Sequence, residues 1–257
     1  ATDRAFAIQT ELAQAIEQNQ LLVYFQPLCQ LSDGALIGAE VLVRWQRPGH
    51  GLVLPDEFIG VAEKSGLLVA LDRWVMNQAV WQLGEWVKCG LWQPDWRLSV
   101  NQNVLDLQQP DVVDVLLQTL HAHRVSAYSI ELEITEDGLM EPSAQIVDNL
   151  QRLLTAGVSL AIDDFGTGYS SLAYLRHLPV SVIKIDQHFV QGMLLQNSDA
   201  VLVQTIVDMA HNLNHVVVAE GIESVEQLDR LREMGAARGQ GYLFGHPAPA
   251  NEFAARW

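Results

Sequence analysis

Eight short apolar runs, most of them separated by segments with helical periodicity, constrain the fold of this chain more than any other feature. In one such segment, Leu202, Ile206, Met209 and Leu213 recur at the spacing of an amphipathic helix. Strands that alternate with helices in this way are typical of a (β/α)8-type barrel. The runs that we expect to be strands are Leu21–Leu28, Leu36–Trp45, Arg97–Asn101, Ser129–Thr135, Val158–Asp163, Val180–Asp186, His215–Glu220 and Arg238–Leu243.

The first two runs differ from the others because no helical segment separates them. They flank Ser32-Asp33-Gly34, and an Asp-Gly pair between two strands favours a tight reversal. We therefore expect a hairpin, so that one strand of the barrel runs against the rest. A helix over Asp3–Gln18 is expected to lead into the hairpin. Residues 1–257 are thus expected to form a single α/β domain.

Composition narrows the classes of protein to which this chain can belong. The 49% apolar fraction can fill one large core, and no apolar run approaches the length of about 18 residues that a membrane span needs. The chain starts with Ala1-Thr2-Asp3, without an initiator Met or a signal segment, so we expect it to be part of a longer protein. Cys29 and Cys89 match no zinc or redox spacing, which indicates ordinary thiols and a cytoplasmic location.

The charge balance excludes further functions. The chain has 31 acidic residues against 15 basic ones, which gives a formal net charge of −16. A surface of this sign repels nucleic-acid backbones and anionic lipids, so we expect no binding to long nucleic acids and no direct membrane contact. An anionic ligand could bind only where the local charge of the protein is positive.

Polar residues occur about once in each apolar run, although a buried carboxylate or amide without a partner is costly. In Leu160-Ala161-Ile162-Asp163, the alternation of side chains directs Leu160 and Ile162 to the helices and Asp163 to the barrel axis. All of these residues except Glu40 and Gln240 lie near the C-terminal end of a run, where barrels of this type build active sites. The set comprises Glu40, Asn101, Glu133, Asp163, Asp164, Lys184, Glu220 and Gln240.

Carboxylates that converge on one mouth cannot all stay ionised, and a divalent cation resolves this conflict. Oxygen ligands favour Mg²⁺ or Mn²⁺, with Ca²⁺ as a competitor, and argue against zinc. A lysine beside the cation would complete a site for phosphoryl transfer. The alternative, for each acid taken singly, is that it caps a helix or pairs with a base.

Several motifs resemble the EAL-domain family of cyclic di-GMP phosphodiesterases, from Tyr24 to the end of the chain. They are Phe25-Gln26-Pro27-Leu28, Glu40-Val41-Leu42-Val43-Arg44-Trp45, Val100-Asn101, Glu133-Ile134-Thr135-Glu136, Asp163-Asp164-Phe165-Gly166-Thr167-Gly168-Tyr169-Ser170-Ser171-Leu172, Lys184-Ile185-Asp186, Ala219-Glu220-Gly221-Ile222-Glu223 and Gln240-Gly241-Tyr242. The resemblance implies a modified TIM barrel with one antiparallel strand, in agreement with the expected hairpin.

The resemblance also implies a chemistry, namely hydrolysis of cyclic di-GMP to linear 5′-pGpG by two Mg²⁺ or Mn²⁺ ions and a bridging hydroxide. By this resemblance Lys184 would orient the hydroxide, and Glu220 and Gln240 would hold a metal-bound water, with Glu220 as a further ligand. Glu136 resembles the residue that anchors the loop Asp164–Ser171, which in the family connects the metals to dimer contacts. The residues that resemble metal ligands are Glu40, Asn101, Glu133 and Asp163 for the first ion, and Asp163 and Asp164 for the second.

Substrate contacts and partners follow from the same resemblance. Gln26 and Arg44 resemble substrate contacts, and a guanidinium suits bidentate phosphate binding. Leu42, Asp164, Glu223 and Tyr242 are expected to line the same substrate site. The resemblance also implies a homodimer, an upstream sensory or GGDEF domain, and inhibition by Ca²⁺.

The chain departs from the family pattern at two places. Val41 replaces the alanine of the Glu-Ala-Leu signature, but alternation sends Val41 to the outer face, so the change should affect packing more than metal binding. Asn103 follows the ligand-like Asn101 where the family usually has a small residue or serine, and could bring a polar group to the mouth. Neither change removes a metal ligand, although a cyclic di-GMP receptor without turnover and a protein-interaction domain remain alternatives.

Glu131 lies two residues before Glu133 and should also point inward, one layer deeper in the barrel. A carboxylate at that depth needs a partner. We predict that Glu131 is buried and pairs with Arg97 on the neighbouring strand.

Overall fold

A closed barrel dominates the computed structural model, which describes residues 2–139, 142–167 and 178–257. Ten strands form one sheet, in the order β10-β1-β9-β8-β7-β6-β5-β4-β2-β3, and pairing of β1 with β2 closes eight of them into a ring. The strands are β1 Leu21–Gln30, β2 Leu36–Arg47, β3 Gly51–Val53, β4 Arg97–Asn101, β5 Ile130–Thr135, β6 Ser159–Phe165, β7 Val182–Ile185, β8 Val216–Ala219, β9 Arg238–Gly239 and β10 Ala248–Pro249.

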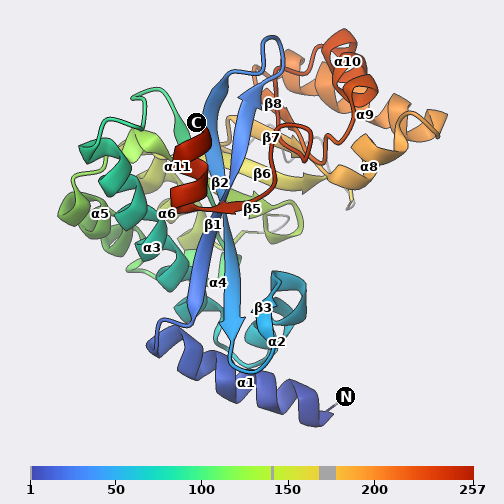
Figure 1. The fold of residues 1–257 in the computed structure, drawn as a ribbon. Helices are drawn as coiled ribbons and strands as arrows, with labels where there is room; N and C mark the ends of the chain where they lie inside the picture. The colour runs from blue at the N-terminus through green and yellow to red at the C-terminus, as the bar shows by residue number, and fades with distance from the viewer. Residues whose placement is uncertain (1, 140–141, 168–177) are drawn as a thin grey trace.

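Helices surround this barrel, and in Figure 1 α3, α5 and α6 lie on one side of the long β1–β2 hairpin while α8, α9 and α10 lie on the other. None of the helices in the described ranges is long and apolar enough to cross a membrane. The α-helices are α1 Thr2–Glu17, α2 Ile59–Lys64, α3 Leu68–Lys88, α4 Val104–Leu107, α5 Val112–His123, α6 Ala144–Ala156, α8 Gln187–Gly192, α9 Asn197–Asn212, α10 Val225–Met234 and α11 Ala250–Arg256. Short 3₁₀ helices span Pro55–Glu57, Ala127–Ser129 and Asp137–Leu139.

The expected hairpin is confirmed. Strand β1 runs antiparallel to both of its neighbours in the ring, β2 and β9, whereas the remaining ring pairs are parallel. Gly34 adopts a φ of +75° in the turn, and the Asp33 carboxylate accepts a hydrogen bond from the Ala35 N–H at 3.0 Å. The architecture is therefore the modified (β/α)8 barrel with one antiparallel strand that the sequence predicts.

Two expectations about the strands were incomplete. Short edge strands β3 and β10, which the apolar pattern does not reveal, extend the sheet beyond the ring. The expected strand Arg238–Leu243 ends at Gly239, because the chain turns at Gly241, where any side chain would lie 2.1 Å from the Ile222 carbonyl oxygen. Gln240 therefore follows the end of β9 instead of lying within a strand.

In the layer below the mouth, apolar side chains fill one half of the barrel interior and polar side chains fill the other half. Leu28, Ala161, Val182 and Val218 form a small apolar cluster separate from the main core. The last three lie two residues before Asp163, Lys184 and Glu220, so they occupy the same inward faces one layer deeper.

The polar half of this layer is built around Glu131, which is 2% exposed. Its carboxylate accepts hydrogen bonds from the hydroxyls of Ser99 at 3.1 Å and Ser159 at 3.0 Å. The prediction that Glu131 is buried is confirmed, but the predicted partner is wrong. Arg97 instead donates to the Tyr128 carbonyl oxygen, because Ser99 and Ser159, and not Arg97, lie in register with Glu131 on the adjacent strands.

The outer face of the barrel packs against the helices. Val41 is 2% exposed and belongs to the main hydrophobic core, as the alternation of side chains predicts. Cys29 and Cys89 are both free thiols, the first buried and the second exposed. Residues 168–172 of the longest motif, and with them the second half of the expected loop Asp164–Ser171, lie outside the described residues.

Candidate active site

Strand ends place the predicted polar residues around one mouth of the barrel. Asn101 ends β4, Glu133 and Asp163 lie near the ends of β5 and β6, and Glu220 directly follows β8. Glu40 reaches the same mouth from the middle of β2, because that strand continues to Arg47. These side chains come from most of the barrel circumference, so the site exists only when the barrel is closed.

The Lys184 ammonium lies at the centre of the group. Its Nζ is 2.6 Å from Glu133 Oε2 and 2.7 Å from Glu220 Oε1, and slightly farther from Asp163 Oδ1 at 3.4 Å and Glu40 Oε2 at 3.5 Å. The side chain is only 2% exposed. One buried cation therefore faces four carboxylates, and the group carries an excess of negative charge.

Two amides fix the orientation of the carboxylates. Asn101 Nδ2 donates to Glu40 Oε1 at 3.0 Å. Gln240 Nε2 donates to Glu40 Oε2 at 2.5 Å and to Glu220 Oε1 at 2.9 Å. Because donation uses the nitrogen atoms, the amide oxygen of Asn101 is the atom that can serve as a cation ligand.

A β-bulge explains how two consecutive aspartates reach the same site. The register of β6 with β7 shifts between Ile162 and Phe165, and Asp164 has a φ of +55°. The Asp163 carboxylate accepts a hydrogen bond from the Asp164 N–H at 3.0 Å, which supports this left-handed conformation. Bulges next to active sites redirect side chains in this way.

Three carboxylates come close enough to share one cation. Asp163, Asp164 and Glu220 each offer an oxygen atom, and these atoms lie within 4.8 Å of one another. The donor set around the mouth consists of carboxylate and amide oxygens, the chemistry that fits a hard divalent ion. The residues present therefore fit the divalent metal that the sequence predicts.

Burial raises the pKa values of three acids in the group. For Glu133 burial and the nearby charge of Glu40 raise the pKa well above its usual value. Burial, with the charge of Asp163 added, raises the pKa of Glu220 to about 8. The same two causes raise the pKa of Asp164 to about 6. Without a divalent cation, the group thus binds protons at pH values where exposed carboxylates are ionised.

Lys184 responds in the opposite way. Burial alone would lower its pKa, but the carboxylates of Asp163, Glu133, Glu220 and Glu40 together raise it well above its usual value. In the metal-free protein Lys184 is therefore charged and pairs with the surrounding carboxylates.

Glu136 lies just past β5 and contacts the segment that carries the aspartates. Its N–H donates to the Asp163 carbonyl oxygen at 3.1 Å, and its carboxylate accepts from the Gly166 N–H, also at 3.1 Å. Glu136 thus ties the end of β5 to the beginning of the loop after β6, the position that the sequence predicts for an anchor.

A cleft of about 440 Å³ opens beside the carboxylates, within the size range of small-molecule sites. It is lined by five of the six predicted substrate contacts, while Asp164 lies outside its lining and close to the carboxylates of Asp163 and Glu220. The lining residues are Gln26, Glu40, Leu42, Arg44, Asp163, Gln187, Gln191, Glu220, Gly221, Glu223, Gln240, Gly241, Tyr242 and Pro247.

Arg44 is the cation in this lining. Its guanidinium carbon lies 5.5 Å from the centre of the Tyr24 ring, and Nη1 donates to the Val43 carbonyl oxygen at 2.8 Å. Tyr242 also lines the cleft, and its exposed ring stacks on His246 with ring centres 4.0 Å apart. The cleft lining therefore combines the guanidinium of Arg44, the exposed ring of Tyr242 and several carboxylates.

Sequence reasoning missed part of the lining. Gln187 and Gln191 are exposed on α8, and Gln191 Nε2 donates to Glu223 Oε1 at 3.1 Å. Their spacing of four residues places them on the same face of a helix, and this signal was present in the sequence. Asp186 is also buried, and it begins α8 by accepting a hydrogen bond from the His188 N–H at 2.9 Å.

One expectation about the mouth is wrong. Asn103 adds no polar group there, because its side chain caps α4 and accepts a hydrogen bond from the Leu105 N–H at 2.8 Å. Its neighbour Gln102 is buried and contacts Asp106. The side chains of Gln102 and Asn103 therefore contact the segment around α4 and do not contribute to the mouth.

Comparisons with known proteins agree with this geometry. The EAL domain family model matches residues 9–247. The chain is 38% identical over 245 residues to the bifunctional diguanylate cyclase/cyclic di-GMP phosphodiesterase MucR of Pseudomonas aeruginosa, covering 95% of this chain and 36% of MucR. It is 42% identical over 242 residues to the cyclic di-GMP phosphodiesterase NbdA of the same organism, covering 94% of this chain and 31% of NbdA. The chain thus spans about a third of the length of these relatives.

The fold also matches a solved structure. The PaMucR phosphodiesterase in complex with c-di-GMP superposes with a TM-score of 0.91 at 38% sequence identity. The match covers 96% of this chain and 99% of that one. The similarity therefore extends over the whole barrel, including all the strands that carry the site.

Proposed function

The chain belongs to the EAL domain family, and on that premise we propose that it hydrolyses cyclic di-GMP to linear 5′-pGpG with the help of two Mg²⁺ or Mn²⁺ ions. Water adds to one phosphorus atom, the bond from that phosphorus to O3′ breaks, and a proton ends on O3′. The observation that carries the proposal is the convergence of four carboxylates on Lys184 beside a cleft that is lined by three of these carboxylates and by Arg44.

The metal ions would be held by oxygen atoms around the mouth. Divalent ions in such a site supply activation of the nucleophile and neutralisation of charge at the phosphate. Glu220, which directly follows β8, would complete the set to which the strands contribute the other ligands. The proposed ligands are Glu40, Asn101, Glu133, Asp163, Asp164 and Glu220.

The protein's own residues would bind and orient the substrate. Arg44 would form hydrogen bonds to a phosphate of cyclic di-GMP, for which a guanidinium is well suited. Tyr242 would contact a base through its exposed ring, and Gln26, Leu42 and Glu223 would complete the cleft wall. The Lys184 ammonium would offset the negative charge that develops on the phosphate oxygens in the transition state.

Gln240 and Glu136 would act on the geometry of the site. Gln240 donates hydrogen bonds to Glu40 and Glu220, so it would keep both carboxylates aimed at the mouth. Glu136 contacts the backbone of Asp163 within the bulge and of Gly166 just past it, so it would hold the bulge in place. Hydrogen bonds that orient the ligands of a metal ion tune its affinity and the activity of the site.

An EAL domain can be joined to other domains and can pair with a second copy of itself. We propose that residues 1–257 act as one EAL domain of a longer signalling protein with a sensory or GGDEF domain, and that the domain forms a homodimer. The similarity to MucR, a bifunctional diguanylate cyclase/cyclic di-GMP phosphodiesterase, supports the first part.

One assay tests the proposal directly. The purified protein is incubated with cyclic di-GMP and Mg²⁺ or Mn²⁺, and the products are separated by chromatography. We expect linear 5′-pGpG, and none when the metal is removed with EDTA. Tight binding of cyclic di-GMP without product over hours would instead identify a receptor, and absence of both would leave a protein-interaction domain.

A further inference from the structure

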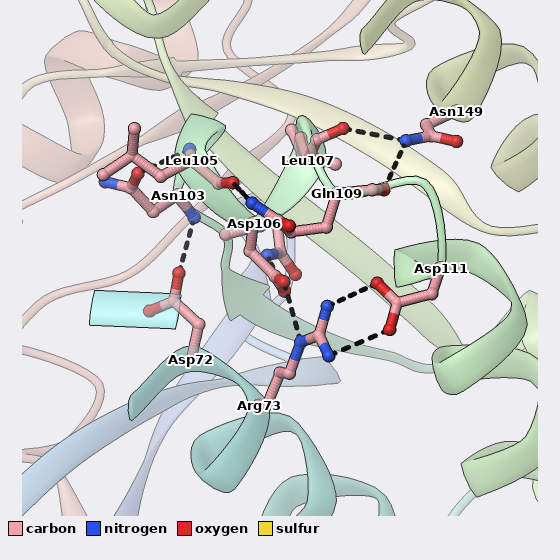
Figure 2. A network of polar contacts seen from close by, with 10 residues as sticks. Asp72, Arg73, Asn103, Leu105, Asp106, Leu107, Gln109, Asp111 and Asn149 are labelled. Carbon is pink, nitrogen blue, oxygen red and sulfur yellow. Dashed lines mark hydrogen bonds and ion pairs between the residues drawn. The ribbon is translucent and has the colours of Figure 1, made fainter. Parts of the chain in front are cut away.

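The connection between β4 and α5 is held by side chains from two neighbouring helices (Figure 2). It begins directly after Asn101, a proposed metal ligand, and contains a single turn of helix, α4. Asn149 of α6 is fully buried and donates from Nδ2 to the carbonyl oxygens of Leu107 at 2.8 Å and Gln109 at 3.0 Å. Asn149 thus fixes the far end of the connection.

The near end is held from α3 by a chain of ionic and amide contacts. Arg73 Nε donates to Asp106 Oδ1 at 2.9 Å, and Gln102 Nε2 donates to Asp106 Oδ2 at 2.9 Å. The other two guanidinium nitrogens of Arg73 bind both carboxylate oxygens of Asp111 at 2.7 and 3.2 Å. Asp106 is 2% exposed, so leaving its carboxylate without these partners would be costly.

A second contact from α3 reaches the backbone one residue farther along. Asp72 Oδ2 accepts a hydrogen bond from the Asn103 N–H at 3.0 Å. The Gln102 N–H donates to the Glu133 carbonyl oxygen at 2.8 Å, which links the ends of β4 and β5. Figure 2 shows Asp72 and Arg73 pointing from α3 towards these neighbouring parts of the connection.

The consequence concerns Asn101. Its side chain is exposed at the mouth, and it donates one hydrogen bond, to Glu40. The two residues that follow it in the chain are both held by side-chain contacts that lead to α3. Its backbone is therefore fixed from behind the site by residues that touch neither the cleft nor the carboxylates.

We propose that Asp72 and Arg73 of α3 are positioning residues for the Asn101 amide, acting through Asn103 and through Asp106 and Gln102. This inference rests on the proposed function, because a metal site is what requires Asn101 to be held in one place. Fixed ligands lower the cost of ordering the site when a cation binds. Loss of either contact from α3 should therefore weaken metal binding more than it changes the rate at saturating metal.

The test compares Arg73→Met with a matched variant, Arg152→Met. Arg152 forms an exposed ion pair with Asp114, at 2.6 Å, between α6 and α5 and away from the β4–α5 connection. Mn²⁺ binding is measured by calorimetry without substrate, and amide hydrogen exchange is measured on peptides covering residues 101–107. We expect Arg73→Met to weaken Mn²⁺ binding about tenfold and to speed exchange in these peptides, and Arg152→Met to do neither.

Further variants separate positioning from general stability. Asp72→Ala removes the acceptor for the Asn103 N–H, while Asp72→Asn retains an acceptor oxygen, so Asn should restore most of the Mn²⁺ affinity that Ala loses. At saturating Mn²⁺, kcat of Arg73→Met should lie within about threefold of wild type. Mn²⁺ affinity and hydrogen exchange equal to those of Arg152→Met would overturn the inference. If the wild type itself bound no Mn²⁺, the proposed metal site would fail and the inference with it, which distinguishes that outcome from a wild type that binds Mn²⁺ and an Arg73→Met variant that binds it equally well.

Discussion

Lys184 Nζ lies 2.6 Å from Glu133 Oε2, and both side chains are 2% exposed. A buried ion pair of this kind does not by itself stabilise a protein, because the free energy needed to remove two charges from water often exceeds the free energy gained from their attraction. Three further carboxylates face the same ammonium. This arrangement is understood more easily as a site prepared for cations and phosphate than as a device for stability.

Replacing Lys184 with Met should harm both the fold and the reaction. In metal-free protein the change leaves buried carboxylates without their cation, and we expect a loss of about 3 kcal/mol in the free energy of unfolding. Saturating Mn²⁺ should restore part of this loss, whereas turnover should stay at least about 100-fold below wild type. Urea unfolding with and without Mn²⁺ checks the first effect, and product formation the second.

Lys88→Met is the matched control, because Lys88 pairs with Glu85 on the exposed surface of α3. That change should alter stability by less than about 0.5 kcal/mol. Equal effects of the two substitutions would show that the position of Lys184 has no special role.

Glu40→Ala and Asp163→Asn should each abolish turnover, because each removes a charged oxygen donor from the proposed metal site. The thermal midpoint should fall little in either variant, since each change also relieves repulsion among the carboxylates. Asp114→Asn serves as the control for removing a negative charge, because the Asp114 side chain is exposed on α5. Full activity in either site variant would refute the assignment of that residue as a ligand.

The sequence predicted much of this site because alternation along a strand is a strong constraint. Leu160 and Ile162 could not face the barrel axis together with Asp163, so the direction of Asp163 followed from its neighbours. The same rule placed Glu133 and Lys184, and the structure brings all three together.

The rule could not predict features that depend on register or backbone irregularity. Alternation alone would send Asp164 away from Asp163, and only the bulge brings both to the mouth. The partner of Glu131 was wrong because an arginine was chosen for its charge, whereas the register of parallel strands places Ser99 and Ser159 beside it. Single-residue shifts between strands leave no trace in composition or periodicity.

Arg44→Lys should weaken substrate binding more than catalysis. Lysine keeps the charge but loses the planar fork that binds two phosphate oxygens and stacks on Tyr24. We expect KM for cyclic di-GMP to rise about tenfold and kcat to change less than about threefold. Arg230→Lys, in an exposed pair with Glu233, should leave both constants unchanged. A fall in kcat with unchanged KM would place Arg44 in the chemical step instead.

The stability of metal-free protein should depend on pH through Glu220. Its pKa is raised to about 8 in the fold, so the protonated carboxyl is favoured by folding. The stability that it contributes is complete below the ordinary pKa of a glutamate and is lost as the pH rises through about 8. Urea unfolding in EDTA from pH 5 to about 8.5 should therefore show falling stability. Glu220→Gln should make that profile less steep, leaving the dependence due to Glu133 and Asp164, and an unchanged slope would contradict the assignment.

Ca²⁺ should bind the site and inhibit the reaction. The carboxylates are held on barrel strands, and amide hydrogen bonds from Asn101 and Gln240 fix Glu40 further. Mg²⁺ takes near-octahedral ligands at about 2.0–2.1 Å, whereas Ca²⁺ takes more ligands at about 2.3–2.6 Å, so the larger ion would bind with the reacting groups misplaced. Turnover at fixed Mn²⁺ should fall as Ca²⁺ is added and recover when Mn²⁺ is raised, because both ions compete for one set of oxygens. Full turnover with Ca²⁺ alone would show that the site tolerates the larger ion and that the carboxylates are less rigidly held than the hydrogen bonds around Glu40 imply.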